Sequence, residues 1–176
     1  MNKNFEIIIK KVIQNEGGYD LHEVPGDRGG RTFAGIAENF WPDWEGWQLL
    51  DNGTPWVHPE LTELVYKFYK LHFWDTQNLD LIDDIKVAYS VFDFCVNSGS
   101  RTGARLAQRV VGAKEDGQIG PITAGLINQK DPELFDKQFA LEKMYRYAAI
   151  VRSDHSQAKF IGGWANRTAR VEQETL

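Results

Sequence analysis

The sequence has little cysteine and no long apolar run. The first shortage excludes stabilisation by an internal disulfide, and the second argues against a secretory signal or a membrane-spanning helix. One cysteine, Cys95, is present among 176 residues, so no disulfide can form within the chain. Cys95 lies in the apolar stretch 91–96, which predicts a buried, unreactive thiol. Lys10, Lys11 and Gln14 interrupt the N-terminal apolar residues, so we expect no secretory signal and no stable membrane insertion. We therefore expect synthesis in the cytoplasm.

Basic residues are too few and too scattered to form a surface for nucleic acid. Lys and Arg number 20 against 25 Asp and Glu, which gives a formal net charge of −5. Binding to nucleic acid depends largely on neutralising phosphates, so we expect no nucleic-acid partner. The 4 histidines are far apart and no phosphate-binding loop is present, so we predict no metal and no cofactor. Any substrate must be held by shape, hydrogen bonds and ring contacts.

Apolar residues in the first half recur at helical rather than strand spacing. Phe5, Ile9 and Val12 share one face of a first helix, which Gly17 and Gly18 end. Strand alternation is sparse, although a short hairpin within residues 19–35 is one option, and residues 36–58 are left unassigned. A further helix is expected over residues 59–73. The predicted fold class is mainly α.

The second half reads as a series of helices. Residues 85–97 are nearly all apolar, so this helix should be central and buried. Gly112 ends a helix over residues 101–111, Pro121 opens the next, and another begins near Trp164. Between them, Asp131 caps a long helix to about residue 152, and residues 116–123 are interpreted as a structural turn and helix start. The apolar positions of the long helix are Leu134, Phe135, Leu141, Tyr145 and Ala148.

Glu16 is the most informative acidic residue. It extends the apolar face of the first helix by one further turn, so it leaves the helix on the apolar side. A carboxyl held against apolar groups resists ionisation, as a general acid near neutral pH must. The other interpretation is that Glu16 only decorates the helix C-terminus, where a negative charge opposes the helix dipole. Gly17 and Gly18 beside it allow a ligand or another segment to approach closely.

Asp27 and Thr32 are the candidates for the second catalytic group. Glycosidic cleavage usually takes two carboxyls, one to protonate the leaving oxygen and one to activate water or attack the sugar. Asp27 lies on the loop after the first helix, so it can face Glu16 across a cleft, and Thr32 can help to hold a water. Asp27 can equally be a turn residue bonded to its own backbone, and Glu23 is a weaker alternative partner.

Two motifs stand close together in the first half. Residues 16–19 read Glu-Gly-Gly-Tyr, and residues 25–36 read Pro-Gly-Asp-Arg-Gly-Gly-Arg-Thr-Phe-Ala-Gly-Ile. This pair resembles the N-acetylmuramidase family of glycoside hydrolases numbered 108, whose elements are Glu-Gly-Gly-Tyr and Asp-Pro-Gly-Gly-x-Thr-x-x-Gly-Ile. Arg28 stands where the family usually has proline. The resemblance implies that Glu16 is catalytic.

Three further motifs follow in the second half. Residues 91–99 read Val-Phe-Asp-Phe-Cys-Val-Asn-Ser-Gly, residues 116–123 read Asp-Gly-Gln-Ile-Gly-Pro-Ile-Thr, and residues 160–167 end in Gly-Trp-Ala-Asn-Arg. They are similar to elements of the same family's C-terminal peptidoglycan-related domain. The resemblance implies a lysozyme-like all-helical fold with an active-site cleft. It further implies a catalytic region at residues 1–86 and a peptidoglycan-related helical region at residues 87–176, packed together as one compact unit.

Four residues are candidates for binding the sugar chain. Asp93 and Asn97 are four residues apart and share one face of the buried helix, where polar groups need partners. They either line the sugar cleft or form an internal polar network that ties the two halves together. Tyr19 and Trp164 are candidate sugar platforms, with packing as the alternative. Arg167 either pairs with a carboxylate or stays solvated.

The predicted function is a muramidase that hydrolyses the bond between N-acetylmuramic acid and N-acetylglucosamine in bacterial peptidoglycan. Glu16 would protonate the leaving oxygen, and Asp27 with Thr32 would position water or stabilise the positive sugar; inversion or retention stays undecided. The alternative is a non-catalytic peptidoglycan-binding or secretion-associated protein, since the family includes phage endolysins and proteins linked to secretion. A peptidase or amidase would need zinc or a Cys–His pair, which the sequence does not clearly offer. The expected partners are glycan strands, with a holin or a secretion machinery giving access to the cell wall.

Overall fold

The computed structural model describes residues 3–23, 28–174 and 176, and most of these are helical. The elements of the first part are α1 (Lys3–Asn15), β1 (Leu21–Glu23), β2 (Arg31–Phe33), β3 (Ile36–Ala37), α2 (Gly46–Asp51), α3 (Pro59–Tyr69) and η1 (Lys70–Trp74). There follow η2 (Asp75–Gln77), η3 (Leu79–Leu81), α4 (Ile85–Ser98), α5 (Ser100–Val111), α6 (Pro121–Gln129), α7 (Pro132–Ser153), η4 (His155–Phe160) and α8 (Ile161–Gln173). The predicted mainly α class is confirmed.

The chain divides into two compact units, Met1–His72 and Phe73–Leu176. This boundary lies earlier in the chain than the functional boundary expected at residues 86 and 87. The assignment of catalysis to residues 1–86 and of a peptidoglycan-related role to residues 87–176 stays a prediction. So does the packing of the two regions as one compact unit.

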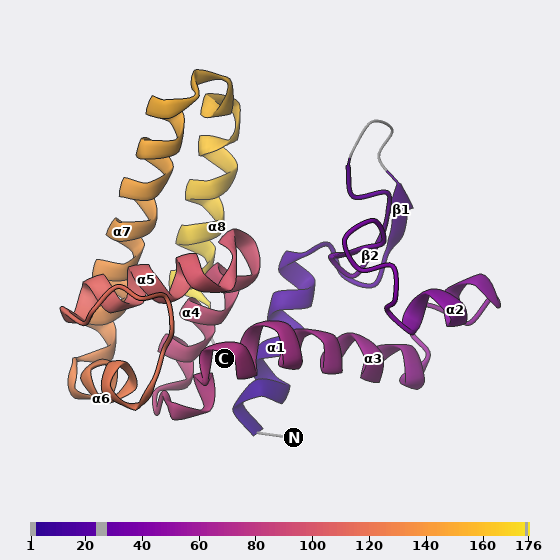
Figure 1. Cartoon of the computed structure of the whole chain (residues 1–176), viewed down its shortest axis with the longest axis horizontal. Coiled ribbons are helices and arrows are strands. Elements are labelled where there is room, and N and C mark those ends of the chain that lie inside the picture. Colours follow the sequence, from indigo (N-terminus) through magenta and orange to yellow (C-terminus); the bar gives the residue numbers. More distant parts are fainter. Residues whose placement is uncertain (1–2, 24–27, 175) are drawn as a thin grey trace. The chain divides into compact units, whose positions relative to one another are not determined.

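The core of the first unit is built on α1 and α3, which cross in Figure 1. The buried side chains of α1 are Phe5, Ile8, Ile9, Val12 and Ile13. Those of α3 are Leu61, Val65, Phe68 and Tyr69. The ring of Tyr66 meets the ring of Phe5 edge-on, with centroids 6.5 Å apart. The helical spacing of apolar residues therefore identified α1 and its buried face, and the helix expected over residues 59–73 corresponds to α3 followed by η1.

Three short strands form an antiparallel sheet in the order β1-β2-β3. Phe33 pairs with Ile36, so β2 and β3 are joined by the two residues Ala34 and Gly35. Both have positive φ, 47° and 79°, as the type I′ turn of a tight hairpin requires. The hairpin expected within residues 19–35 is confirmed by the pairing of β1 with β2.

The core of the second unit is centred on α4. All residues from 87 to 95 are buried, which confirms the prediction of a central helix. Gly103 of α5 allows close approach, because a Cβ there would lie 3.1 Å from the Cα of Cys95. Burial raises the pKa of the Cys95 thiol to about 12, so the expectation of a buried, unreactive cysteine is confirmed.

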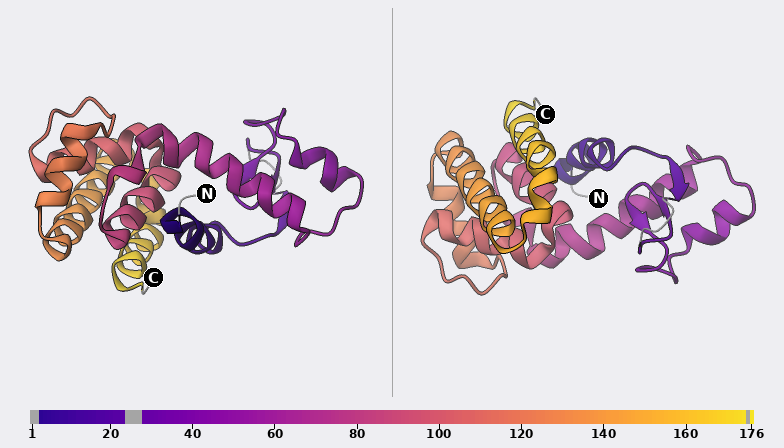
Figure 2. Two further views of the ribbon diagram at one scale, coloured as in Figure 1. Left: turned by 90° about the horizontal axis from the view of Figure 1, so that it is seen from below. Right: turned by 90° about the horizontal axis from the view of Figure 1, so that it is seen from above.

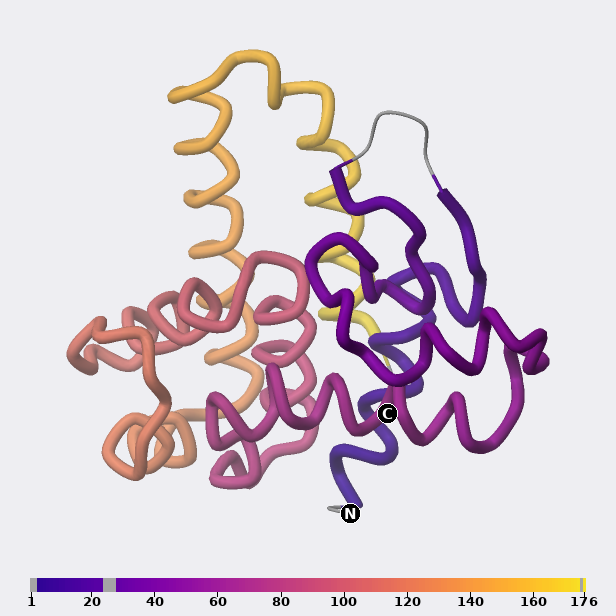
Figure 3. The backbone as a smooth tube through the Cα atoms, turned by 45° about the vertical axis from the view of Figure 1, so that its right-hand side comes forward, coloured from indigo at the N-terminus to yellow at the C-terminus, as the bar shows by residue number. Residues whose placement is uncertain are grey.

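The helices α7 and α8 lie side by side in the second unit, as Figure 2 shows. The backbone turns back between them through η4, which can be followed in Figure 3. The side chain of Asp131 accepts a hydrogen bond from the Leu134 N–H at 2.8 Å, so the predicted cap of α7 is confirmed.

The apolar positions of α7 that were read from the sequence do not mark its buried face. Of those five, only Phe135 is buried, whereas Leu141 and Tyr145 are 58% and 68% exposed. The inward residues are Phe135, Asp136, Phe139, Lys143 and Tyr147. The Nζ of Lys143 donates to the Oγ of Ser90 at 3.0 Å and lies 4.4 Å from the ring centre of Phe139. The inward aromatic residues do follow helical spacing, but charged Asp136 and Lys143 lie among them while Leu141 and Tyr145 point outward, so apolar residues alone do not separate the two faces.

Two buried glutamines, Gln77 and Gln108, hold the segment between α5 and α6. The Nε2 of Gln108 donates to the Oδ1 of Asp116 at 2.8 Å and to the carbonyl of Gln118 at 3.0 Å. Its Oε1 accepts a hydrogen bond from the Gly117 N–H at 2.9 Å. These bonds support the structural interpretation of residues 116–123.

Candidate active site

Glu16 is the C-terminal cap of α1. Its N–H donates to the carbonyl of Ile13 at 3.1 Å. The Gly18 N–H reaches the same carbonyl at 2.8 Å, and the Gly17 N–H reaches that of Gln14 at 3.3 Å. These two bonds form a Schellman motif, in which Gly17 takes the left-handed position with φ of 99°. The two glycines therefore end the helix as predicted and fix the backbone that carries Glu16.

The side chain of Glu16 is half-buried and lies against the tip of a hairpin and a tyrosine. The hydroxyl of Tyr69 in α3 donates to the carbonyl of Ala34 at 2.8 Å. A Cβ on Gly35 would lie 3.0 Å from the Cβ of Glu16 and would also meet that hydroxyl. Gly35 is therefore needed for the close approach of the turn, while Tyr69 holds the turn in place. The motif contained Gly35, but no sequence pattern identified Tyr69.

Thr32 lies at the centre of β2, opposite His22 in β1 and Ala37 in β3. It is half-buried, and its hydroxyl donates to the carbonyl of Gly30 at 3.4 Å. The second carboxyl candidate, Asp27, lies outside the described residues. The catalytic roles of Asp27 and Thr32 therefore stay predictions.

Tyr19 packs between the sheet and α3. Its ring centre lies 6.1 Å from that of Phe33. Burial raises the pKa of Tyr19 to about 12, and its hydroxyl is hydrogen-bonded with Thr62 and Tyr66. These contacts explain the position of Tyr19 by packing, and its use as a sugar platform stays a prediction.

Arg31 joins the sheet to α2, a role that the sequence analysis missed. Its guanidinium donates to both oxygens of Glu38 at 2.7 and 2.6 Å and to Asp51 at 2.7 Å, and it lies 5.6 Å from the ring centre of Trp47. These bonds hold the pKa of Glu38 and of Asp51 below the usual range. Both carboxylates are thus charged partners of Arg31 and not proton donors. Their separations of 7 and 20 residues fit no motif spacing.

Asp93 and Arg167 form an ion pair inside the second unit. The guanidinium donates to the two oxygens of Asp93 at 3.0 and 2.9 Å, and the side chains of Arg167 and Asp93 are 14% and 4% exposed. The pair joins α8 to α4 within the second unit, and a polar network that ties the two halves together stays a prediction. Asn97 is exposed and accepts a hydrogen bond from the Ser98 hydroxyl at 3.3 Å. Contact of Asp93 or Asn97 with a sugar stays a prediction.

Trp164 is half-buried on α8 and stacks on Tyr147 of α7. Their ring centres are 5.0 Å apart with an angle of 22° between the planes. Packing between the two helices explains this position, and the role of Trp164 as a sugar platform stays a prediction.

The described residues form neither a metal-binding cluster nor a membrane-spanning helix. Within residues 3–23, 28–174 and 176, no three His, Cys, Asp or Glu side chains gather where they could hold a metal ion. In the same part of the chain, no helix is long and apolar enough to cross a membrane.

Comparisons with known proteins match both halves of the chain. The family model described as Glycosyl hydrolase 108 matches residues 9–99, and the one described as Predicted Peptidoglycan domain matches residues 102–169. The structure is similar to that of SagA from Brucella abortus, with a TM-score of 0.68 and 21% identity, over 96% of this chain and 91% of that chain. At this identity the likeness shows the fold alone. No curated protein matches the chain. The two family models indicate a peptidoglycan-related function.

Proposed function

The chain belongs to the glycosyl hydrolase 108 family, and from this premise we propose that it hydrolyses the bond between N-acetylmuramic acid and N-acetylglucosamine in peptidoglycan. The observation that carries the proposal is the placement of Glu16 on a helix cap, half-buried against the turn at Gly35. Glycoside hydrolases protonate the leaving oxygen with a carboxylic acid. A rigid helix end holds such an acid within the narrow range of positions that proton transfer needs.

In the proposed reaction, Glu16 gives its proton to the glycosidic oxygen as the bond from that oxygen to the anomeric carbon breaks. The sugar left behind carries positive charge, which a second carboxylate must stabilise or attack. We assign this role to Asp27, with Thr32 holding the water. The oxygen of that water ends on the anomeric carbon with one of its protons, and its other proton replaces the one that Glu16 gave to the leaving oxygen.

The first experiment compares wild type with Glu16→Gln on purified cell walls, counting new reducing ends. The change keeps the size of the side chain and removes its acidic proton, so the rate should fall by about 10²–10⁴-fold, the usual contribution of general acid catalysis. Glu6→Gln is the matched control, because Glu6 is an exposed glutamate of the same helix. Circular dichroism should show that both variants fold. Equal lysis by wild type and Glu16→Gln would remove Glu16 from the mechanism.

A second pair of variants identifies the second carboxylate. Asp27→Asn should abolish lysis almost as completely as Glu16→Gln, while Glu23→Gln should leave most of it. The opposite result would assign the role to Glu23, which lies on β1 and is exposed.

A non-catalytic peptidoglycan-binding protein is the second candidate, because a peptidoglycan domain model matches residues 102–169. Co-sedimentation of wild type with purified walls measures binding separately from lysis. Sedimentation without new reducing ends at any pH from acid to neutral would favour this candidate over the hydrolase.

The substrate also indicates where the protein would act. Peptidoglycan lies outside the cytoplasmic membrane, so we propose that the chain acts at the cell wall, reached through a holin lesion or a secretion machinery. Fractionation of producing cells tests this, since protein that stays in the cytoplasm while walls are degraded would contradict it.

A further inference from the structure

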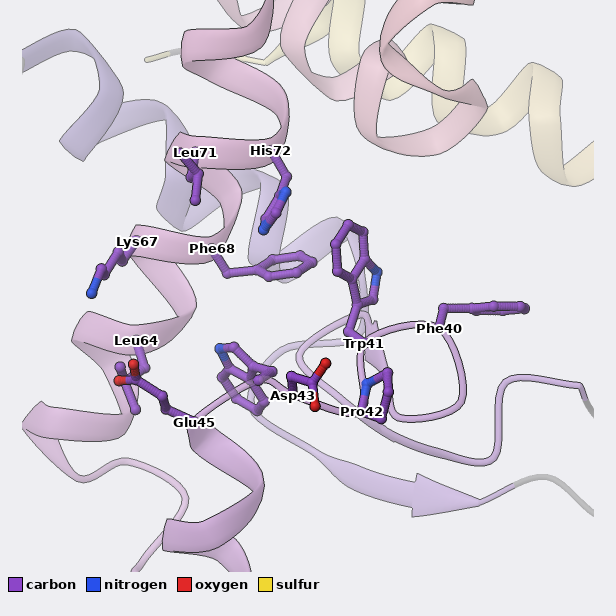
Figure 4. Close-up of a pocket in the computed structure, with 11 residues that line it drawn as sticks. Phe40, Trp41, Pro42, Asp43, Glu45, Leu64, Lys67, Phe68, Leu71 and His72 are labelled. Atoms are coloured by element: carbon purple, nitrogen blue, oxygen red, sulfur yellow. The ribbon is translucent and has the colours of Figure 1, made fainter.

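A groove lined by aromatic rings lies in the first unit, between α3 and the loop before α2 (Figure 4). Its volume is about 440 Å³, within the range of sites for small ligands. Trp41, Phe68 and His72 gather at one end of it, and Glu45 and Lys67 lie at the other. None of the residues that line it belongs to the proposed catalytic or sugar-binding set.

The main ring of the groove is both exposed and fixed in place. Trp41 is 37% exposed, yet its ring meets that of Phe68 edge-on at 4.9 Å and lies 4.4 Å from that of His72. The Nε1 of Trp47 donates to the backbone carbonyl of Trp41 at 2.8 Å. A ring held this way loses little freedom when a ligand stacks on it, which favours binding.

Trp44 also lines the groove, and its indole N–H has no partner among the described residues. Its ring is fixed by stacking on Phe33 at 6.2 Å and by Trp47 at 5.1 Å. Its Nε1 is buried. Buried donors without partners are rare and costly. An oxygen acceptor on a bound ligand would satisfy this donor.

The rim of the groove restricts the charge of the ligand. Asp43, Glu45 and Lys67 lie there, with two negative charges and one positive. Such a rim offers no net attraction to a carboxylate, so it disfavours the lactyl group of N-acetylmuramic acid and the stem peptides attached to it. A neutral sugar fits better, because its C–H face can stack on Trp41 while its oxygens meet the polar groups.

We propose that this groove binds an N-acetylglucosamine unit of the glycan strand. Trp41 is its stacking platform, and Trp44 donates to an acetamido or hydroxyl oxygen. The choice of this sugar rests on the proposed function, whereas the groove itself does not.

The groove and the turn beside the proposed acid contact neighbouring faces of α3. Phe68 lines the groove, and the next residue, Tyr69, holds the turn beside Glu16. Successive side chains of an α-helix point about 100° apart. The groove is therefore a separate contact for the strand, beside the site of cleavage.

The test measures binding of chitohexaose, a neutral chain of N-acetylglucosamine, by titration calorimetry in a Glu16→Gln background that prevents cleavage. Trp41→Ala should weaken binding about 10-fold or more. Trp56→Ala is the control, because Trp56 is 43% exposed in the same unit and does not line the groove. Equal affinity of the two variants, or no binding by any variant, would overturn the proposal.

Trp44→Phe removes the proposed hydrogen-bond donor and keeps an aromatic ring. The smaller ring loses packing against Phe33 and Trp47, so the melting temperature should fall by a few degrees while the protein stays folded. Chitohexaose affinity should fall roughly 5-fold, the effect of one hydrogen bond. An affinity equal to that of the parent would refute the assigned donor.

The groove and the hydrolase can fail independently. If cell-wall lysis depends on Glu16 but chitohexaose affinity is unchanged by Trp41→Ala, only the groove proposal is refuted. Trp41-dependent affinity in a protein without lytic activity would support the groove and refute the hydrolase.

Discussion

Asp136 gives the second unit a pH-dependent stability that one substitution should remove. Its side chain is 5% exposed, and its Oδ1 has no hydrogen-bond partner among the residues that the structure describes. Burial, with a smaller contribution from the charge of Glu172, raises the pKa of Asp136 to about 7. Lys143 and Lys86 act in the opposite direction but do not offset this effect.

The sign and size of the effect follow from proton linkage. In the unfolded chain an aspartate has a pKa of about 3.9, so between pH 4 and 7 only the folded state keeps the proton. The free energy of unfolding then falls by about 1.4 kcal/mol per pH unit, or about 4 kcal/mol over the window. Above the folded pKa of about 7 both states are ionised and the loss stops. Burial lowers the pKa of Lys143 to about 8, so that lysine is protonated in both states throughout the window and adds no slope.

Asp136→Asn keeps the shape of the side chain and removes its titration. The variant should match wild type near pH 4 and exceed it by a few kcal/mol at pH 8, where the melting temperature should be higher by roughly 10 °C. Differential scanning calorimetry from pH 4 to 8 measures both profiles. Asp83→Asn controls for the loss of one negative charge at an exposed position. Parallel profiles for wild type and Asp136→Asn would refute the reasoning.

Three further substitutions test other parts of the structure. Gly35→Ala adds a Cβ, at a positive φ, that would meet the side chains of Glu16 and Tyr69. Cell-wall lysis should then fall at least about 10-fold in a folded protein. Unchanged lysis would show that the turn does not contribute to catalysis. Arg167→Leu leaves Asp93 buried without its cation, so the free energy of unfolding in urea should fall by about 3–5 kcal/mol, and adding Asp93→Asn should restore part of it. Gln108→Ala leaves the Gly117 N–H without its acceptor, so stability should fall by about 1–3 kcal/mol and exchange of that amide hydrogen should accelerate; slow exchange would contradict this.

Local chemistry made the helix ends predictable from the sequence. Gly17 takes a left-handed conformation that other residues rarely adopt, and Asp131 caps α7 with its own side chain. Such groups act within a few residues, so the sequence contains both partners side by side. The same holds for the central burial of α4, because a run of apolar residues needs no particular partner to be driven from water. Glu16 was found in this way, as the acid at a predictable helix end.

Tertiary structure alone decided which distant residues meet. The hydroxyl of Tyr69 reaches the carbonyl of Ala34 across 35 positions of the chain, and no spacing rule connects them. The face of α7 was misjudged because Lys143 is buried where Ser90 of another helix accepts its hydrogen bond, an arrangement that an apolar pattern cannot represent. Burial also raises the pKa of Asp136, since the cost of ionising a carboxyl depends on what surrounds it. The sequence by itself determined most of the long helices and the candidate acid, but not α2 or β3, and folding decided the packing and charge environment around them.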